Sequence, residues 1–168
     1  MKFFITFIAI ISFQLSIAQA YHGAGDIKFQ VGANFQNNGT GIMSTLDFGL
    51  GENISVGLAS SYILGIDSFR NTEEGIPGFK DRFDIQGRFN ANLGNVINID
   101  ENFDVYPGLH VGLKNFGGHL GVRYYLTHGF GFFSELNFPI SKYDPGHLTR
   151  AEKLNNQISV NLGVSFCI

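Results

Sequence analysis

The stretch Asp26-Ile27-Lys28-Phe29-Gln30-Val31-Gly32-Ala33-Asn34-Phe35-Gln36 decides the fold of this chain, because its apolar side chains fall on every second residue. Charged, amide and glycine residues occupy the positions between them. A period of two is that of a β-strand, in which successive side chains point to opposite faces, whereas a helix repeats every 3.6 residues. Residues 26–36 are therefore predicted to form a strand with one apolar and one polar face.

The same alternation recurs along the rest of the chain, over residues 42–50, 54–64, 83–93, 103–114, 119–126, 130–138 and 158–168. Turn-forming residues separate several of these segments, at 37–40, 51–53, 115–118 and 127–129. The connection 94–102 is longer, and part of it is expected to be strand. Two long irregular segments, 65–82 and 139–156, have no period. These patterns predict an all-β fold, an eight-stranded antiparallel up-and-down transmembrane β-barrel.

Residues 1–20 precede the first strand and have the pattern of an export signal. Lys2 supplies the positive charge, a mostly apolar run follows, and Ala18-Gln19-Ala20 is the small-x-small pattern that a signal peptidase cuts. The apolar run is shorter and more interrupted than the roughly 20 residues of a membrane-spanning helix. We therefore expect residues 1–20 to be a cleaved signal peptide and residues 21–168 to form one barrel domain.

Charge and cysteine content narrow the classes of function. The chain has 11 basic and 14 acidic residues, and without Lys2 ten basic residues remain, a net charge of −4. No basic patch suited to nucleic acid results. The single cysteine, Cys167, cannot form an internal disulfide. After residue 20 no run approaches about 18 consecutive apolar residues, so a membrane role would have to use strands.

Three features favour a membrane barrel over a soluble lipocalin-like lipid binder. The apolar faces of the strands carry no Lys, Arg, Asp or Glu, whereas the polar faces are rich in Gly, Ser and Asn and suit a narrow lumen. The longer strands match the roughly 9–11 residues that cross a bilayer at a tilt. Aromatic residues near the strand ends are expected to form two interfacial girdles: Phe29, Phe35, Tyr62, Phe83, Phe103, Phe130, Phe138 and Phe166.

Loop lengths set the expected orientation, because outer-membrane barrels combine short periplasmic turns with longer external loops. With both termini in the periplasm, loops 65–82 and 139–156 would lie outside the cell and could bind an extracellular ligand. The last strand ends in Phe166-Cys167-Ile168, which resembles the signal read by the barrel-assembly machinery. We expect a monomer in the outer membrane of a Gram-negative bacterium, in contact with outer-membrane lipid and, during insertion, with that machinery.

Several short motifs carry a family resemblance. These are residues 25–32 (GDIKFQVG), 47–51 (DFGLG), 105–108 (VYPG) and 119–125 (HLGVRYY). Together they resemble an uncharacterised family of small outer-membrane barrels from Bacteroidota, and more broadly the eight-stranded outer-membrane protein A and X groups. The resemblance covers essentially the whole of residues 21–168 but rests on structural glycine and aromatic positions. It implies the barrel fold and brings no catalytic signature.

Seven charged residues on the polar faces are expected to share the lumen: Asp47, Asp84, Arg88, Asp104, Lys114, Arg123 and Glu135. Buried charges are tolerated only when they are paired and hydrogen-bonded. We therefore expect an ion-pair network that joins Arg88 and Arg123 to acidic residues including Glu135 and Asp47. Such a network would plug the barrel and fix the register of its strands. The alternative is a narrow pore with a continuous water path.

Other candidate chemistry in the sequence is weaker. Of the five histidines, His22, His110, His119, His128 and His147, only His110 and His119 are expected to point inward on adjacent strands, without a third ligand. Ser141, Asp144 and His147 lie in one external loop but nothing orients them as a catalytic triad. We therefore predict no catalytic residues, no metal and no cofactor. A structural or surface-interaction role ranks first, a narrow pore second and an outer-membrane lipid-modifying enzyme third.

Overall fold

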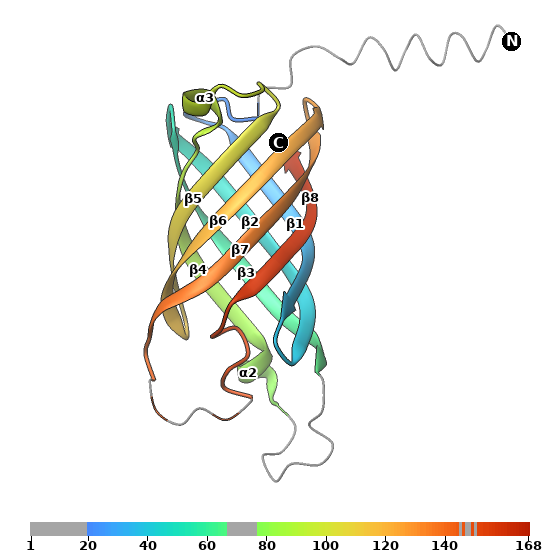
Figure 1. Cartoon of the computed structure of the whole chain (residues 1–168), viewed down its shortest axis with the longest axis vertical. Coiled ribbons are helices and arrows are strands. Elements are labelled where there is room, and N and C mark those ends of the chain that lie inside the picture. The colour runs from blue at the N-terminus through green and yellow to red at the C-terminus, as the bar shows by residue number, and fades with distance from the viewer. Residues whose placement is uncertain (1–19, 67–76, 145, 147–148, 150) are drawn as a thin grey trace, which may run out of the picture.

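The computed structural model describes residues 20–66, 77–144, 146, 149 and 151–168. Eight strands and two short helices follow one another along these residues (Figure 1): β1 Ile27–Gln36, β2 Gly39–Gly51, β3 Ile54–Ile66, α2 Phe79–Arg82, β4 Phe83–Ala91, α3 Gly94–Ile97, β5 Phe103–Gly112, β6 Asn115–Thr127, β7 Phe130–Lys142 and β8 Ser159–Cys167. The predicted signal peptide lies outside the described residues, apart from Ala20.

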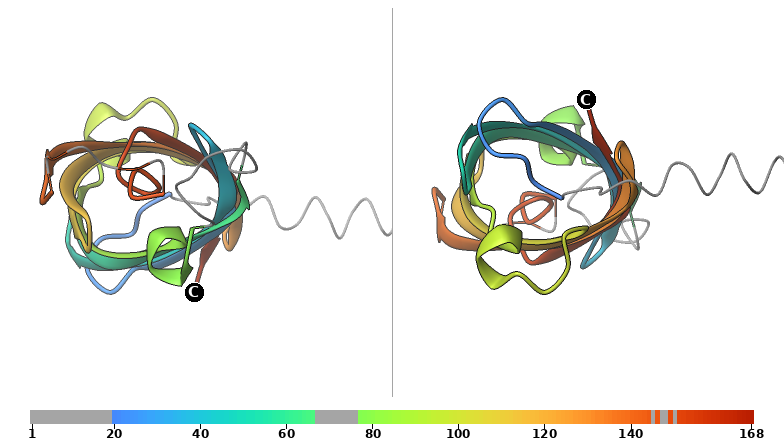
Figure 2. Two further views of the ribbon diagram at one scale, coloured as in Figure 1. Left: turned by 90° about the horizontal axis from the view of Figure 1, so that it is seen from below. Right: turned by 90° about the horizontal axis from the view of Figure 1, so that it is seen from above.

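The strands form one closed ring in chain order (Figure 2). Each strand pairs antiparallel with the next, and β1 closes the barrel on β8 with Lys28 opposite Cys167 and Gln36 opposite Ser159. Closure leaves no free sheet edge, which is the arrangement that allows strands to cross a bilayer. The predicted eight-stranded antiparallel barrel is confirmed.

The two faces of the barrel wall differ in the way the alternation predicts. Val160 and Leu162 of β8 point outward and are 38% and 48% exposed, whereas Arg88, Arg123 and Glu135 point inward and are at most 5% exposed. Most of the fully buried side chains are charged, amide, hydroxyl or aromatic. A soluble lipid-binding barrel would have the opposite arrangement, because its apolar side chains would be enclosed. The apolar outer surface is that of a barrel surrounded by lipid.

Several strand boundaries differ from the prediction. Residues 115–118 are not a turn but the start of β6, and the turn lies at residues 113–114. The connection 94–102 contains no strand; it begins with helix α3, which ends at Asn98 in the left-handed conformation (φ 50°). Strand β7 continues through Pro139 to Lys142, so the second long irregular segment begins at residue 143.

Pro107 lies in the middle of β5, where its missing N–H raises the question of a lost ladder bond. Towards β6 the register is unbroken, with Pro107 opposite Leu120. Towards β4 only residues 86–90 pair with 108–112, so the ladder ends at Gly108, the residue that follows Pro107 in the sequence. The carbonyl of Val105, which has the same parity, accepts a bond from Leu93 and so faces β4. The missing N–H therefore falls where pairing with β4 has already stopped.

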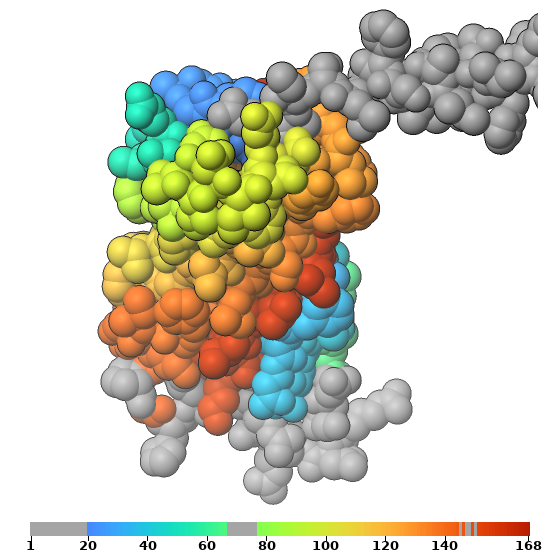
Figure 3. Space-filling view, turned by 45° about the horizontal axis from the view of Figure 1, so that its top comes forward, coloured from blue at the N-terminus to red at the C-terminus, as the bar shows by residue number. Residues whose placement is uncertain are grey.

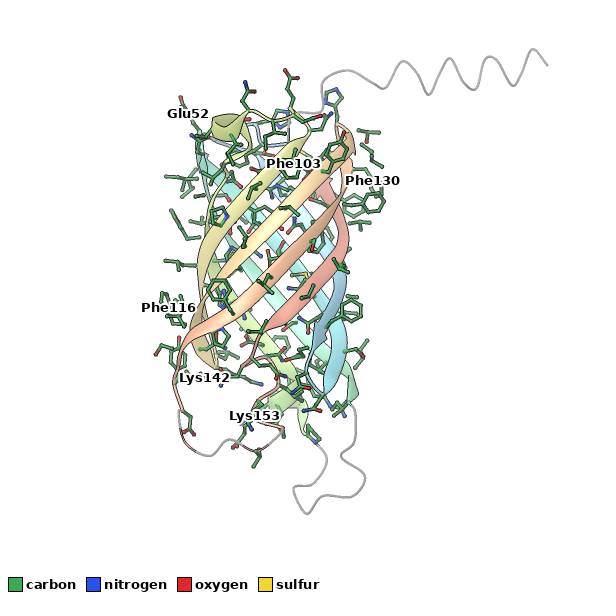
Figure 4. All side chains as sticks on the ribbon, viewed as in Figure 1. Glu52, Phe103, Phe116, Phe130, Lys142 and Lys153 are labelled. Atoms are coloured by element: carbon green, nitrogen blue, oxygen red, sulfur yellow. The ribbon has the colours of Figure 1, made fainter. Side chains whose placement is uncertain are left out.

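Aromatic side chains gather near both ends of the barrel. At the end that holds Ala20 and Ile168, called here the terminal end, Phe130 packs against Phe132 and Phe166 with ring centres 5.5 and 5.7 Å apart. At the opposite end, called the loop end, Phe79 packs against Tyr62 and Phe83 at 5.7 and 5.3 Å. Phe116 and Phe130 point away from the wall near opposite ends in Figure 4. Both groups suit the interfacial girdles of a membrane barrel.

The two short helices lie at opposite ends of the barrel (Figure 1). The segment of α3 stands out from the wall at the terminal end, as the space-filling view in Figure 3 shows. Among the described residues, no helix is long and apolar enough to cross a membrane, a finding that does not bear on crossing by strands.

Candidate functional site: the polar lumen and its two mouths

A three-residue charge cluster occupies the middle of the lumen. The Nη2 atom of Arg88, on β4, lies 2.6 Å from Oε2 of Glu135 on β7, across the barrel interior. Its Nε atom lies 3.3 Å from Oδ1 of Asp47 on β2 and donates to the amide oxygen of Asn90 at 3.2 Å. The three charged side chains are at most 2% exposed. One guanidinium thus joins three strands that are not all neighbours in the ring.

A second pair lies closer to the terminal end. Arg123 of β6 donates through Nε and Nη2 to Oδ2 of Asp104 on β5, at 3.0 and 2.7 Å, and both side chains are 0% exposed. The two residues are direct cross-strand partners. Nη2 also donates to Asn92 at 2.6 Å. Asp104 is further fixed by the backbone N–H of Gly94 at the start of α3, at 2.8 Å.

Tyr106 separates the two guanidinium groups. Its ring centre lies 4.6 Å from the Cζ atom of Arg123 and 5.8 Å from that of Arg88, within the range of a cation–π contact. Gly121 lies opposite it on β6, and a Cβ at that position would overlap the tyrosine ring. The amide of Gln30 lies 3.3 Å from the tyrosine hydroxyl. The absence of a side chain at Gly121 therefore makes the room that Tyr106 fills.

The seven charged residues predicted for the lumen lie in three places. Five of them form the two ion-paired groups, Asp47 with Arg88 and Glu135, and Asp104 with Arg123. Asp84 and Lys114 lie towards the loop end instead. Asp84 accepts bonds from Gln86 and from the backbone N–H of Leu113, and Lys114 donates to the carbonyls of Asp81 and Leu154.

The loop-end mouth is closed by residues 151–157, which fold into the barrel opening (Figure 2). Leu154 is 0% exposed. Asn155, which is left-handed with φ 58°, donates to the carbonyl of Arg82 at 2.8 Å and accepts from Ser61 and Gln36. Its carbonyl accepts from Asn115 at 3.1 Å. This segment, the loop-end plug, therefore bonds to at least three parts of the barrel rim.

A small cavity separates the loop-end plug from the central charge cluster. Its volume is about 30 Å³, and its lining includes His110, Glu135, Asn155 and Asn161. A polar cavity of this size holds about one or two water molecules.

The terminal-end mouth is closed by the chain that enters β1. Tyr21 is 2% exposed, and its hydroxyl donates to the carbonyls of Ile54 and Gly51, at 2.6 and 3.1 Å. Asn95 donates to the carbonyl of Tyr21 at 3.2 Å. Burial, together with the nearby carboxylate of Asp26, raises the pKa of the Tyr21 hydroxyl above its ordinary value of 10.0. Residues 20–26 thus form a second plug, the terminal plug.

The two inward-facing histidines form a stacked pair in the lumen. The Nδ1 atoms of His110 and His119 lie 3.5 Å apart, their ring centres are 5.7 Å apart, and Nε2 of His119 lies 2.6 Å from the amide oxygen of Asn90. Within the described part of the chain, no third metal-ligating side chain completes a site with them. They are side chains held within the lumenal hydrogen-bond network.

Two of the three residues considered for a catalytic triad, Ser141 and Asp144, lie among the described residues. Ser141 is an exposed residue of β7, opposite Phe116, and Asp144 is exposed just beyond the strand. Asp144 accepts a bond from the backbone N–H of Gly146 at 3.2 Å. His147 lies outside the described residues. The described geometry positions neither a nucleophile nor a base.

Sequence reasoning missed several residues that close the lumen. Asp26 and Lys28 form a buried ion pair of 2.9 Å, and both stand on the polar parity of the first strand, so the signal was available. Tyr106 was also on an inward parity. Tyr21 and Asn155 had no such signal, because both lie in segments without a period.

The fold and the filled polar lumen together define a class: a closed, eight-stranded barrel of the transmembrane type. Comparison with a solved structure of a designed barrel supports the fold. A de novo designed transmembrane β-barrel matches with a TM-score of 0.54 and 8% identity, over 88% of this chain and 98% of the designed one. The solution structure of Outer Membrane Protein G from Pseudomonas aeruginosa matches with a TM-score of 0.47 and 12% identity, over 88% and 99% of the two chains.

The chain belongs to a family of unknown function, DUF6646, whose model matches residues 10–168. No curated protein gives a significant match.

Proposed function

We propose that this protein is a non-conducting, non-enzymatic barrel of the Gram-negative outer membrane, which holds surface segments on a rigid scaffold. The observation that carries the proposal is the occupied lumen. Two ion-paired groups fill its centre, and a plug closes each mouth. A solute path would require the separation of buried charges, which is costly because each would lose its partner.

Conductance in planar bilayers tests the closed lumen. The purified protein should show no reproducible open state, while a wide porin in the same bilayer does. A variant in which residues 151–157 are replaced by a short Gly-Ser linker tests the plug separately. It should also remain closed, because the central cluster around Arg88 is untouched. A regular open state of the native protein would contradict the proposal and favour the narrow pore.

The outer-membrane location is part of the same proposal, with residues 1–20 as a cleaved signal peptide. The resemblance to small Bacteroidota barrels and to the outer-membrane protein A and X groups supports it, as does the apolar outer surface. Outer-membrane lipid and the barrel-assembly machinery would be the partners, and the barrel would be a monomer. Cell fractionation, N-terminal sequencing and heat-modifiable gel migration test this, and recovery in the soluble fraction would contradict it.

Orientation can be tested independently. With Cys167→Ser as background, Glu152→Cys introduces an exposed thiol at the loop end and Asn98→Cys one at the terminal end; both native residues are exposed. On intact cells a membrane-impermeant maleimide should label only Glu152→Cys, and both variants should react after lysis. Labelling of Asn98→Cys alone on intact cells would reverse the orientation.

The surface role is proposed for the loop end, where the described parts of segments 65–82 and 139–156 lie. Tyr143 is 54% exposed there, amid charged side chains such as Lys142 and Lys153. Exposed aromatic residues within a charged rim are the composition of many binding surfaces. The variant Tyr143→Ser should lower adhesion of cells to an extracellular matrix substrate. The matched control, Val96→Ser at the terminal end, where Val96 is 62% exposed, should not.

A further inference from the structure

Three metal-ligating side chains of different kinds meet at the terminal end, outside the lumenal charge clusters. They are His22 in the terminal plug, Asp26 just before β1, and Cys167 at the end of β8. One ligand atom of each lies within 4.8 Å of the other two. The Sγ atom of Cys167 lies 3.4 Å from Oδ1 of Asp26, and Nδ1 of His22 lies 3.8 Å from Oδ2. We propose that this trio binds a soft, monovalent metal ion, Cu(I) in chemical class.

The donor atoms select the class of metal. A thiolate sulfur and an imidazole nitrogen are the ligands of Cu(I) and Zn(II), whereas Mg²⁺ and Ca²⁺ require sets of oxygen atoms. Here only one of the three side chains supplies oxygen. Sulfur from Cys167 and nitrogen from His22 would therefore be the main ligands, with the carboxylate of Asp26 beside them.

Charge balance favours a monovalent ion over a divalent one. The ammonium of Lys28 lies 2.9 Å from Oδ1 of Asp26 and 3.2 Å from Sγ of Cys167, and this side chain is 1% exposed. The carboxylate charge is thus already neutralised. When a monovalent metal replaces the thiol proton, the S–H bond is lost, an S–metal bond forms, the proton goes to solvent and the total charge is unchanged. A divalent ion would add a positive charge beside a buried ammonium.

The burial of the trio also suits metal entry. The side chain of His22 is 44% exposed, whereas that of Asp26 is 1% exposed and is fixed by the backbone N–H of His22 at 2.9 Å. The imidazole can therefore approach the sulfur from the solvent side without displacement of a strand. Bound metal would tie the terminal plug to the last strand, beside the β1–β8 seam where Lys28 and Cys167 pair.

The test is metal competition on the mature chain in detergent micelles, under anaerobic and reducing conditions. Cu(I) is offered as its coloured bicinchoninate complex, and Ag(I) serves as a monovalent ion that does not change its oxidation state. We expect one Cu(I) per chain. Cys167→Ser should abolish its retention, and His22→Gln should weaken it at least tenfold. His128→Gln, an exposed histidine at the same end, should bind like the native protein.

Each other outcome counts against the proposal. Equal affinity in His22→Gln and the native protein would reduce the site to an ordinary thiol, and retention in Cys167→Ser would place the metal elsewhere. Zn(II) bound as tightly as Cu(I) would overturn the monovalent assignment. Lys28→Met sharpens the charge argument, since loss of the ammonium should raise Zn(II) affinity more than Cu(I) affinity. Heat-modifiable migration verifies that each variant is folded, and none of these results bears on conductance or adhesion.

Discussion

The polar side chains in the terminal half of the lumen are joined mainly by ion pairs, whereas those in the loop half are joined mainly by hydrogen bonds between amides. Towards the terminal end, Arg123 pairs with Asp104 and Lys28 with Asp26, each between residues fixed on strands or at their ends. Towards the loop end, Asn34 donates to Asn161 at 2.7 Å, and Asn155 bonds to Gln36 and Ser61. The ion pairs lie on strands or directly at their ends, whereas the amide bonds of Asn155 depend on the loop-end plug.

The difference implies two kinds of stability in one barrel. Removal of one partner from a buried ion pair leaves an uncompensated charge. Single substitutions at the ion pairs of the terminal half should therefore lower the stability of the whole fold. Each hydrogen bond that a side-chain amide of a loop makes contributes less to stability. Such bonds can break locally while the strands remain paired. Substitutions in the terminal half should therefore change global unfolding, and those in the loop half should change local opening.

The largest effect is expected from Arg88→Met, at the centre of the lumen. This change leaves Asp47 and Glu135 buried without their cation, so the free energy of unfolding should fall by about 3–5 kcal/mol. Denaturant unfolding in micelles measures it. Lys153→Met, an exposed charge at the loop end, is the control and should change stability little. A loss under about 1 kcal/mol for Arg88→Met would mean that the central cluster contributes little to the fold.

A slightly smaller effect should follow from Arg123→Met, which strands the single carboxylate of Asp104. We expect a loss of about 3 kcal/mol, and the double variant Arg123→Met/Asp104→Leu should recover part of it. A buried ion pair can be replaced by apolar groups at little cost, but the Gly94 N–H and the Asn92 amide also lose a partner here. A double-mutant cycle in the same unfolding assay gives the coupling energy. Additive losses would show that the two side chains do not stabilise the fold as a pair.

The sequence predicted which strand residues face outward and which face the lumen, for a physical reason. The barrel wall is a single sheet between lipid and a packed lumen, so apolar and polar side chains must alternate with a strict period of two. The strand ends were less predictable. Gly117 and Gly118 suggested a turn, but both lie within β6, where a Cβ on Gly117 would overlap His110 and one on Gly118 would overlap the ring of Phe138. Glycine makes space there, and sequence alone does not distinguish that use from a turn.

The site was predictable only where it follows the strands. Parity placed Arg88, Glu135 and Arg123 inside, but it could not choose partners, since register decides that Asp104 rather than Glu135 faces Arg123. Helix α3 has four residues, too few to show a helical period. The sequences of the two plugs have no period either, so nothing in them predicts that these segments close the mouths of the barrel.

Gly121→Ala should give an intermediate effect, about 1–3 kcal/mol of destabilisation, because its Cβ would overlap the ring of Tyr106. Addition of Tyr106→Leu should relieve part of the loss that Gly121→Ala causes. Gly87→Ala is the matched control, since a Cβ at that glycine meets nothing within 4 Å. Equal losses for Gly87→Ala and Gly121→Ala would show that the close approach to Tyr106 is not responsible.

In the loop half, Asn155→Ala should lower global stability by only about 1 kcal/mol, yet open the loop-end plug. The side chain of Asn155 bonds to Arg82, Ser61 and Gln36, so its removal loosens the segment that carries Lys153. The backbone bonds of residue 155 to Gln36 and Asn115 remain. Trypsin should then cut after Lys153 several times faster than in the native protein, while denaturant midpoints change little. The comparison between the two halves fails if the denaturant midpoint shifts as much as for Arg123→Met.

The smallest effect is a pH dependence at the terminal plug. Burial alone would raise the pKa of Asp26, but the hydrogen bond from the backbone N–H of His22 and the ammonium of Lys28 hold it below its ordinary value of 3.8. A carboxyl with a lowered folded-state pKa contributes stability above its unfolded pKa and loses it as the pH falls through the folded one. Stability measured from pH 5 downward should therefore fall less steeply in Asp26→Asn than in the native protein. Protonation of Asp26 removes the same contacts as the Asn substitution, so the stabilities of the two proteins should converge in acid. If the two plots of stability against pH run parallel instead, Asp26 does not govern this acid response.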